Sequence, residues 1–138
     1  MQVKSFALGL SLLSLIMAGC GSSNKIPLGR VEGVITVDGQ PLDGAEIAFE
    51  PPNGRPSVGW TDEKGHYELD YTMEKKGAIL GTHVVRIKSA RSASGGEGDG
   101  PKVEARKEIL PAKYHTSSTL TAEVTKGNNV IDFALVTK

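Results

Sequence analysis

The chain has 138 residues, with 16 Lys and Arg against 16 Asp and Glu, and a single cysteine. This charge balance argues against a nucleic-acid-binding protein, which needs a basic surface to displace counterions from phosphates. With one cysteine there is no internal disulfide, so a single domain of this size must be stabilised by buried aliphatic side chains.

The N-terminal segment is typical of a bacterial signal peptide. Lys4 supplies a positive start, and residues 6–17 (FALGLSLLSLIM) form an uncharged apolar run. A run of about a dozen residues fits the apolar region of a signal peptide and is shorter than the ~20 residues that cross a bilayer. We therefore expect residues 1–19 to be cleaved from the mature protein.

The end of this segment, Leu-Ile-Met-Ala-Gly-Cys, resembles the lipobox of bacterial lipoproteins. The resemblance implies that Met17, Ala18 and Gly19 are recognised by the signal peptidase and that Cys20 becomes the acylated N terminus; Met17 takes a place usually held by leucine. Two or three chains such as palmitate, at about 0.8 kcal/mol per buried methylene, would anchor the protein without spanning the membrane. The alternatives are an unmodified Cys20 after a generic cleavage site and an uncleaved anchor.

Residues 21–28 (GSSNKIPL) are predicted to be a polar, flexible tether, at most about 26 to 29 Å long when extended. In lipoprotein sorting, an aspartate directly after the cysteine retains the protein at the inner membrane, and Gly21 occupies that place here. The resemblance thus implies a bacterial cell envelope location, with the outer membrane favoured and the domain facing the periplasm or the cell surface. Membrane lipid is the partner expected at Cys20.

Residues 30–71 predict four short strands, because apolar and polar residues alternate with period two. Val31, Ile35 and Val37 would share one face, and Ile47 and Phe49 repeat the pattern in the second strand. Turn signals separate the strands. Asp38-Gly39, Asp43-Gly44 and Asn53-Gly54 tolerate a positive φ, and Pro51-Pro52 and residues 62–65 mark further turns.

Three stretches of the chain, GRVEGVITVDGQPLDGAEIAFEP, WTDEKGHYEL and GAILGTHVVRI, together resemble the carboxypeptidase regulatory-like domain of the transthyretin-like (prealbumin) class, including its small bacterial lipoproteins. The shared pattern is a Gly-x-Val strand, a D-G-x-P-L turn, a second strand, a T-D-x-x-G-x-Y/F corner and a G-x-Y/H-x-V-x-I strand. The resemblance covers most of residues 29–135. It implies a seven-stranded β-sandwich without catalytic residues.

The second half of the chain predicts three more strands, at residues 82–88, 120–124 and 131–135. Residues 89–102 are rich in Gly and Ser and predict a mobile loop. Residues 103–114 leave two alternatives open, a short helix over 103–109 or an irregular edge strand at 109–111.

The prediction is therefore an all-β, seven-stranded antiparallel β-sandwich of the transthyretin-like or immunoglobulin-like kind, after a cleaved signal peptide. Residues 1–19 are the signal peptide, 20–28 the lipidated cysteine and tether, and 29–138 the carboxypeptidase regulatory-like domain.

The candidate chemical groups do not form a known motif. His66, His83 and His115 lack the close spacing that brings two ligands to a metal, so we expect them at edges or in solvent. Asp38, Asp43 and Asp62 stand where turns favour Asp, outside any calcium-loop pattern. Residues 95–100 have the glycine spacing of a P-loop, but its Lys and Ser or Thr are missing. No metal or cofactor is predicted, and the ligand stays open.

Trp60, Tyr67, Tyr71 and Tyr114 would form a glycan-binding platform if their rings were exposed. For Trp60 and Tyr67 we expect core positions across the hairpin at residues 62–65. Exposed rings of Tyr71 and Tyr114 would support a carbohydrate-binding module.

The functional prediction is a membrane-anchored, non-catalytic envelope lipoprotein whose sandwich contacts a protein or a glycan. A carbohydrate-binding module is the first alternative. A hydrolase of the transthyretin-like type is the second, and it would need a histidine to converge with Arg86 or Arg106 in a cleft. The C-terminal Tyr-Arg-Gly-Ser motif of the hydroxyisourate hydrolases is missing, because the chain ends in FALVTK.

Overall fold

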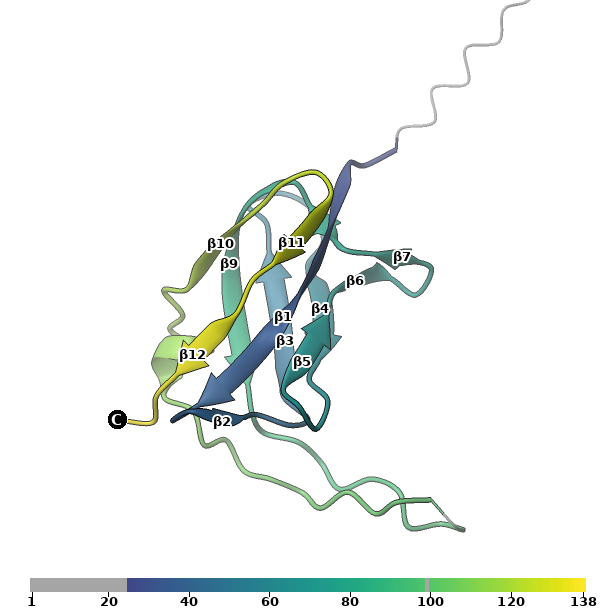
Figure 1. Cartoon of the computed structure of the whole chain (residues 1–138), viewed down its shortest axis with the longest axis vertical. Coiled ribbons are helices and arrows are strands. Elements are labelled where there is room, and N and C mark those ends of the chain that lie inside the picture. The colour runs from purple at the N-terminus through teal and green to yellow at the C-terminus, as the bar shows by residue number, and fades with distance from the viewer. Residues whose placement is uncertain (1–24, 99) are drawn as a thin grey trace, which may run out of the picture.

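The computed structural model describes residues 25–98 and 100–138 as a β-sandwich, which confirms the predicted fold class. Two sheets lie face to face, with almost no helix (Figure 1). The described elements are β1 (Leu28–Val37), β2 (Gln40–Pro41), β3 (Glu46–Glu50), β4 (Ser57–Trp60), β5 (His66–Glu68), β6 (Asp70–Thr72), β7 (Lys75–Lys76), β8 (Ala78–Ile79), β9 (Gly81–Lys88), the short 3-10 helix η1 (Ala112–Tyr114), β10 (Thr121–Val124), β11 (Asn128–Val130) and β12 (Phe133–Leu135).

Strand β1 organises the first sheet, in which it pairs antiparallel with β2, β5 and β8 and parallel with β11 and β12. Its burial alternates as predicted, with Val31 and Ile35 fully buried and Arg30 and Glu32 exposed. Leu28 already pairs with Ile79, so β1 begins at the last residue of the expected tether.

The end of the chain returns beside β1 in the parallel direction, as two short strands where the sequence predicted one antiparallel strand. The break falls at Ile131 and Asp132. The Ile131 amide donates to the Glu32 carbonyl at 2.8 Å, and the Asp132 carboxylate accepts from the Val34 amide at 2.8 Å in place of a backbone carbonyl. Gly33 permits this approach, because a Cβ there would lie 1.9 Å from the Ile131 carbonyl oxygen.

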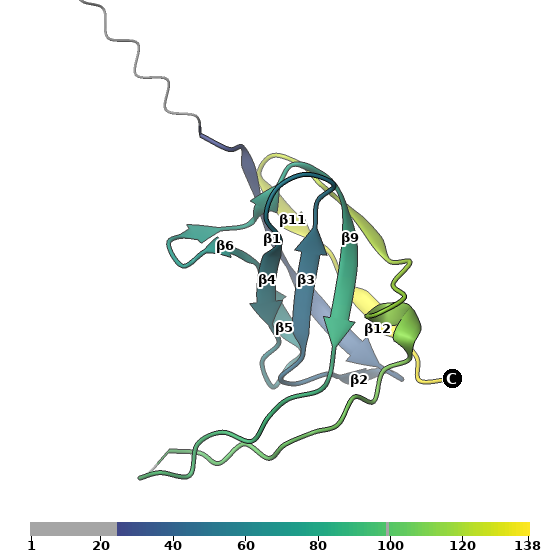
Figure 2. The same cartoon turned by 180° about the vertical axis from the view of Figure 1, so that it is seen from behind.

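The second sheet has the order β10-β9-β3-β4-β6-β7 and is antiparallel throughout (Figure 2). Ile47 pairs with Ile87 and Phe49 with Val85, so the inward faces of β3 and β9 are apolar. These side chains meet those of the first sheet in one core. Its largest fully buried members include Tyr67, Phe49, Ile35, Ile47, Leu69, Ile87, His83, Val31, Val85 and Val124.

Strand β4 faces the opposite way from the prediction. Ser57 and Gly59 point inward, while Trp60 is 61% exposed, so the expected core position of Trp60 is wrong. The cause is the neighbouring backbone, because a Cβ on Gly59 would lie 2.4 Å from the carbonyl oxygen of Glu68. With no room for a side chain at Gly59, the pleat turns Trp60 to the outer face.

The predicted turns form. Asp38 and Gly39 both have positive φ, 49° and 82°, as a tight hairpin turn requires. At the corner before β5, the Asp62 carboxylate accepts from the amides of Lys64 and His66 at 2.9 and 3.0 Å. These two hydrogen bonds lower the pKa of Asp62.

Between β9 and η1 the chain forms a long projection, which we call the arm (residues 89–98 and 100–110). Its two sides are bridged at Arg91 and Arg106 and again at Ser94 and Val103. The alternative of a helix over 103–109 is wrong, and residues 109–111 do not form a strand. The arm leaves the sandwich at the end opposite to the one where the chain enters (Figures 1 and 2).

Candidate functional site

The three histidines lie in different surroundings. His83 on β9 is 1% exposed, and its Nε2 donates to the Ile79 carbonyl at 2.6 Å, so the expected edge position is wrong for this residue. His66 on β5 is exposed, and its Nε2 lies 3.6 Å from a Glu32 carboxylate oxygen. The Nε2 of His115, after η1, lies 3.0 Å from the Leu110 carbonyl.

The arginines of the hydrolase alternative are engaged elsewhere. Arg86 donates to the Glu50 carboxylate at 2.9 Å and to the backbone carbonyl of His115 rather than to its ring. Arg106 lies at the base of the arm. The hollow beside His83 contains no arginine; its other lining residues are Glu50, Pro51, Pro52, Thr82 and Val84.

The acidic residues of the turns serve the fold. Asp62 caps its own turn, the Asp38 carboxylate accepts from the amide and hydroxyl of Thr137, and Asp43 pairs with Arg91 at 3.2 Å. Over residues 25–98 and 100–138, no group of three His, Cys, Asp or Glu side chains is arranged to hold a metal ion.

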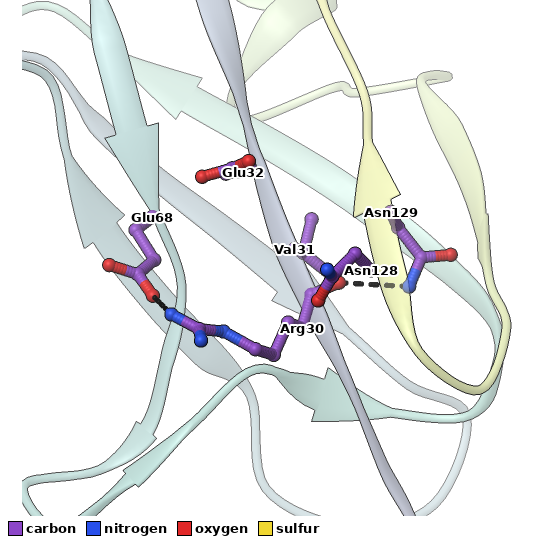
Figure 3. Close-up of a pocket in the computed structure, with 6 residues that line it drawn as sticks. All are labelled: Arg30, Val31, Glu32, Glu68, Asn128 and Asn129. Carbon is purple, nitrogen blue, oxygen red and sulfur yellow. Dashed lines mark hydrogen bonds and ion pairs between the residues drawn. The ribbon is translucent and has the colours of Figure 1, made fainter.

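A small hollow opens on the outer face of the first sheet, between β1, β5 and β11 (Figure 3). Its volume is about 160 Å³, below the 300–1,000 Å³ common for small-molecule sites. Its lining residues are Arg30, Val31, Glu32, Glu68, Asn128 and Asn129.

Arg30, Glu68 and Asn129 of this hollow already have partners. Arg30 donates to Glu68 at 2.6 Å, which raises the pKa of the guanidinium, and the Asn129 amide donates to the Arg30 carbonyl at 2.8 Å. A paired guanidinium and a bonded amide offer little to a ligand, so the hollow is a weak candidate.

A dense polar network lies at the base of the arm. The sequence analysis did not predict it. The Glu108 carboxylate accepts from the amides of Ser89 and Leu110 at 3.1 and 2.9 Å, from the amide of Ala90 at 3.4 Å, and from the Ser89 hydroxyl. Burial alone raises the pKa of Glu108, but these hydrogen bonds together outweigh burial, so the pKa lies below its ordinary value.

Two arginines complete this network. Arg106 donates to the carbonyls of Ser89 and Asp43 at 2.8 and 2.7 Å, and partial burial lowers its pKa. Arg91 donates to the Glu104 carbonyl at 3.1 Å and to the Asp43 carboxylate. The arm is therefore tied to the sandwich at its root by charged side chains. A hint in the sequence was an arginine on each side of the Gly-rich stretch, Arg91 and Arg106, with Glu104 and Glu108 on the C-terminal side.

Three of the four candidate aromatic residues are buried. Tyr67 is in the core as predicted; its hydroxyl donates to the Ile131 carbonyl at 2.6 Å, and burial raises its pKa. Tyr71 and Tyr114 are each 8% exposed, so they cannot form a platform for a glycan. Trp60 alone of the four presents its ring to solvent. The small residues at 57 and 59 were a hint of this orientation, but alternation alone fits either face of the sheet.

The predicted lipidation site and its recognition residues, Cys20 with Met17, Ala18 and Gly19, lie outside the described residues. Within the described part of the chain, no helix is long and apolar enough to cross a membrane.

Comparison with known proteins finds distant similarity to solved structures. None of the known protein-family models matches the chain, and no curated protein matches it. A solved structure of a DUF3823 family protein from Parabacteroides merdae ATCC 43184 is 15% identical, with a TM-score of 0.41, and the match covers 80% of this chain and 46% of that one. A 9R-lipoxygenase from Cyanothece PCC8801 is 20% identical, with a TM-score of 0.40 and coverage of 79% and 16%. The chain thus spans less than half the length of each.

Proposed function

We propose that this protein is a non-catalytic envelope lipoprotein, a β-sandwich binding module of the carboxypeptidase regulatory-like kind held at a bacterial membrane by acylated Cys20. Residues 1–19 are the signal peptide in this proposal, and residues 29–138 are the module. The support comes from the lipobox resemblance together with the way the chain enters the sandwich.

The entry into the sandwich is the observation that carries the proposal. Lys25, Ile26 and Pro27 are exposed, and Leu28 starts β1 at once. The Pro27 carbonyl accepts from the Leu80 amide at 3.4 Å, which ties the entry point to the end of the sandwich where β9 begins. Residues 21–27 reach at most about 23 to 25 Å, so an acylated Cys20 would hold this end close to the lipid surface.

The opposite end would then face away from the membrane. β9 runs from Gly81, beside the entry point, to Lys88, where the arm departs. Seven steps of about 3.3 Å separate these residues by about 23 Å. The arm and Trp60 would be presented to partners outside the lipid layer.

The arrangement of the described side chains favours binding over catalysis. The histidine rings do not meet a guanidinium group in a hollow, and the strongest polar network, around Glu108, is bonded to backbone amides of the arm. The polar groups around Glu108 stabilise the base of the arm and are not directed at a cleft.

Membrane fractionation of the full-length protein beside Cys20→Ala tests the proposal, with mass spectrometry of the N-terminal peptide. We expect an acylated Cys20 in the membrane fraction, and release of the Cys20→Ala variant from it. Ser22→Ala is the matched control and should stay acylated. A soluble mature protein with a free Cys20 thiol would overturn the lipoprotein assignment.

The favoured outer membrane is tested by a second variant. Gly21→Asp places an aspartate directly after the cysteine and should shift the acylated protein to the inner membrane fraction. If wild type and Gly21→Asp both lie in the inner membrane, the outer-membrane assignment is wrong.

A further inference from the structure

The outer face of the second sheet presents three side chains in one row, which we call the Trp60 row (Trp60, Glu46 and Lys88). Glu46 pairs with Trp60 on one side and with Lys88 on the other. The next row on these three strands, through Ile47, is fully buried, so the Trp60 row points outward. Cross-strand neighbours have Cβ atoms about 5 Å apart, which places the carboxylate between the indole and the ammonium group.

The side chains of the Trp60 row have no partner in the described chain. The indole is 61% exposed, and neither Glu46 nor Lys88 forms an ion pair or a side-chain hydrogen bond with another described residue. On the same face, Glu50 lies four residues from Glu46 along β3 and Arg86 lies two residues from Lys88 along β9; these two form an ion pair at 2.9 Å. Glu50 and Arg86 thus bond to each other, whereas the charged groups of Glu46 and Lys88 are free to bind a ligand.

From these observations we infer that the Trp60 row is a binding subsite for one ring of a neutral saccharide. The C–H groups on the apolar face of a pyranose pack against the flat, exposed face of the indole. The Glu46 carboxylate accepts hydrogen bonds from sugar hydroxyls, and the Lys88 ammonium donates to them. One acidic and one basic group sum to zero charge, which suits a neutral sugar better than an anionic polymer.

The surroundings of Trp60 favour a sugar over a protein partner. Protein-binding hot spots lie within a continuous apolar patch that excludes water. On this face Val58 and Ala48, in the row next to the Trp60 row, are half-buried, and the other exposed large apolar side chain, Val84, lies one row further on, beside Glu50. A single exposed aromatic ring beside free polar groups matches a ligand that is itself apolar on one face and polar at its rim.

The subsite gives the binding module of the proposed function a ligand class. It lies at the arm end of β9, about 23 Å from the entry point, so a lipid-anchored protein would present it away from the membrane. The inference rests on the binding part of the proposal and not on acylation. If the Cys20→Ala protein leaves the membrane and still binds sugar, the saccharide site does not depend on acylation.

The test uses Trp60 as its own reporter, because the chain contains one tryptophan. The full chain in a sugar-free detergent is titrated with short oligosaccharides of glucose, N-acetylglucosamine, mannose and galactose while the emission of Trp60 is followed. We expect a saturable blue shift with at least one of these sugars, and a dissociation constant on the order of 1 mM.

Variants locate the binding. Calorimetry replaces fluorescence for Trp60→Ala, which should weaken binding by about tenfold or more, the equivalent of one stacking contact. Glu46→Gln and Lys88→Met should each weaken it severalfold with the blue shift retained at saturation. Met73→Ala removes a fully exposed apolar side chain from the β6–β7 turn and should bind like wild type.

Two results would overturn the inference. One is the lack of a saturable change in Trp60 emission with every sugar of the panel. The other is sugar binding that Trp60→Ala leaves unchanged, which would place the site elsewhere. A Trp60 response to a protein partner alone would count against the saccharide as well.

Discussion

Glu108→Gln should destabilise the protein by about 1.5 to 3 kcal/mol, the range for hydrogen bonds to a charged group. In the wild type both carboxylate oxygens accept: Oε1 from Ser89 and Leu110, and Oε2 from the amides of Ser89 and Ala90. A glutamine keeps one acceptor oxygen and turns its NH₂ group toward amides that also donate. The substitution therefore removes the charge and leaves at least one buried donor without an acceptor.

The effect should depend on pH in a defined direction. Because the folded-state pKa of Glu108 is lowered, the stabilisation is fully present above the unfolded value of about 4.3. It declines as the pH falls below that value and is lost once the pH passes the folded-state pKa. The stability difference between wild type and Glu108→Gln should be constant near neutral pH and shrink below about pH 4.

Urea unfolding followed by circular dichroism, repeated from neutral to acidic pH, measures this difference. The matched control is Glu104→Gln, which makes the same chemical change in the same arm. Glu104 pairs with Lys102 at 3.0 Å in an exposed position, so its substitution should change the stability by less than about 0.5 kcal/mol. Equal effects of the two variants, or a Glu108→Gln difference that persists at acidic pH, would refute the assigned role of Glu108.

Two further substitutions test the first sheet by the same unfolding measurement. Gly33→Ala should cost about 3 kcal/mol or more, since its Cβ would overlap the Ile131 carbonyl; wild-type stability would contradict the close approach of these backbones. Tyr67→Phe should cost about 1 to 3 kcal/mol, because the Ile131 carbonyl loses its hydroxyl donor. Tyr71→Phe is the control and should change the free energy of unfolding by less than about 0.5 kcal/mol. Equal losses of stability for Tyr67→Phe and Tyr71→Phe would refute the role of the Tyr67 hydrogen bond.

The elements predicted correctly from the sequence depend on neighbours along the chain. The period-two pattern of β1 places Val31 and Ile35 in the core whatever their partners are. Asp38-Gly39 and the Asp62 turn are equally local, because the positive φ values and the carboxylate-to-amide hydrogen bonds involve residues at most four positions apart.

The elements that were wrong or missed depend on distant backbone. Trp60 faces outward because the carbonyl of Glu68 occupies the space beside Gly59, and its alternating pattern alone fits either orientation. The helix over 103–109 does not form, because the two sides of the arm bridge to each other across the Gly-rich stretch.

The sequence by itself thus determined the all-β class, the tight turns and the core-facing positions of the strongest strands, since a strand's period and a turn's φ are properties of a few adjacent residues. Only the tertiary structure decided which way β4 faces, that the C-terminal strands run parallel to β1, and that Glu108 holds the arm. Each of these follows from segments far apart in the chain competing for the same space and the same hydrogen-bond partners.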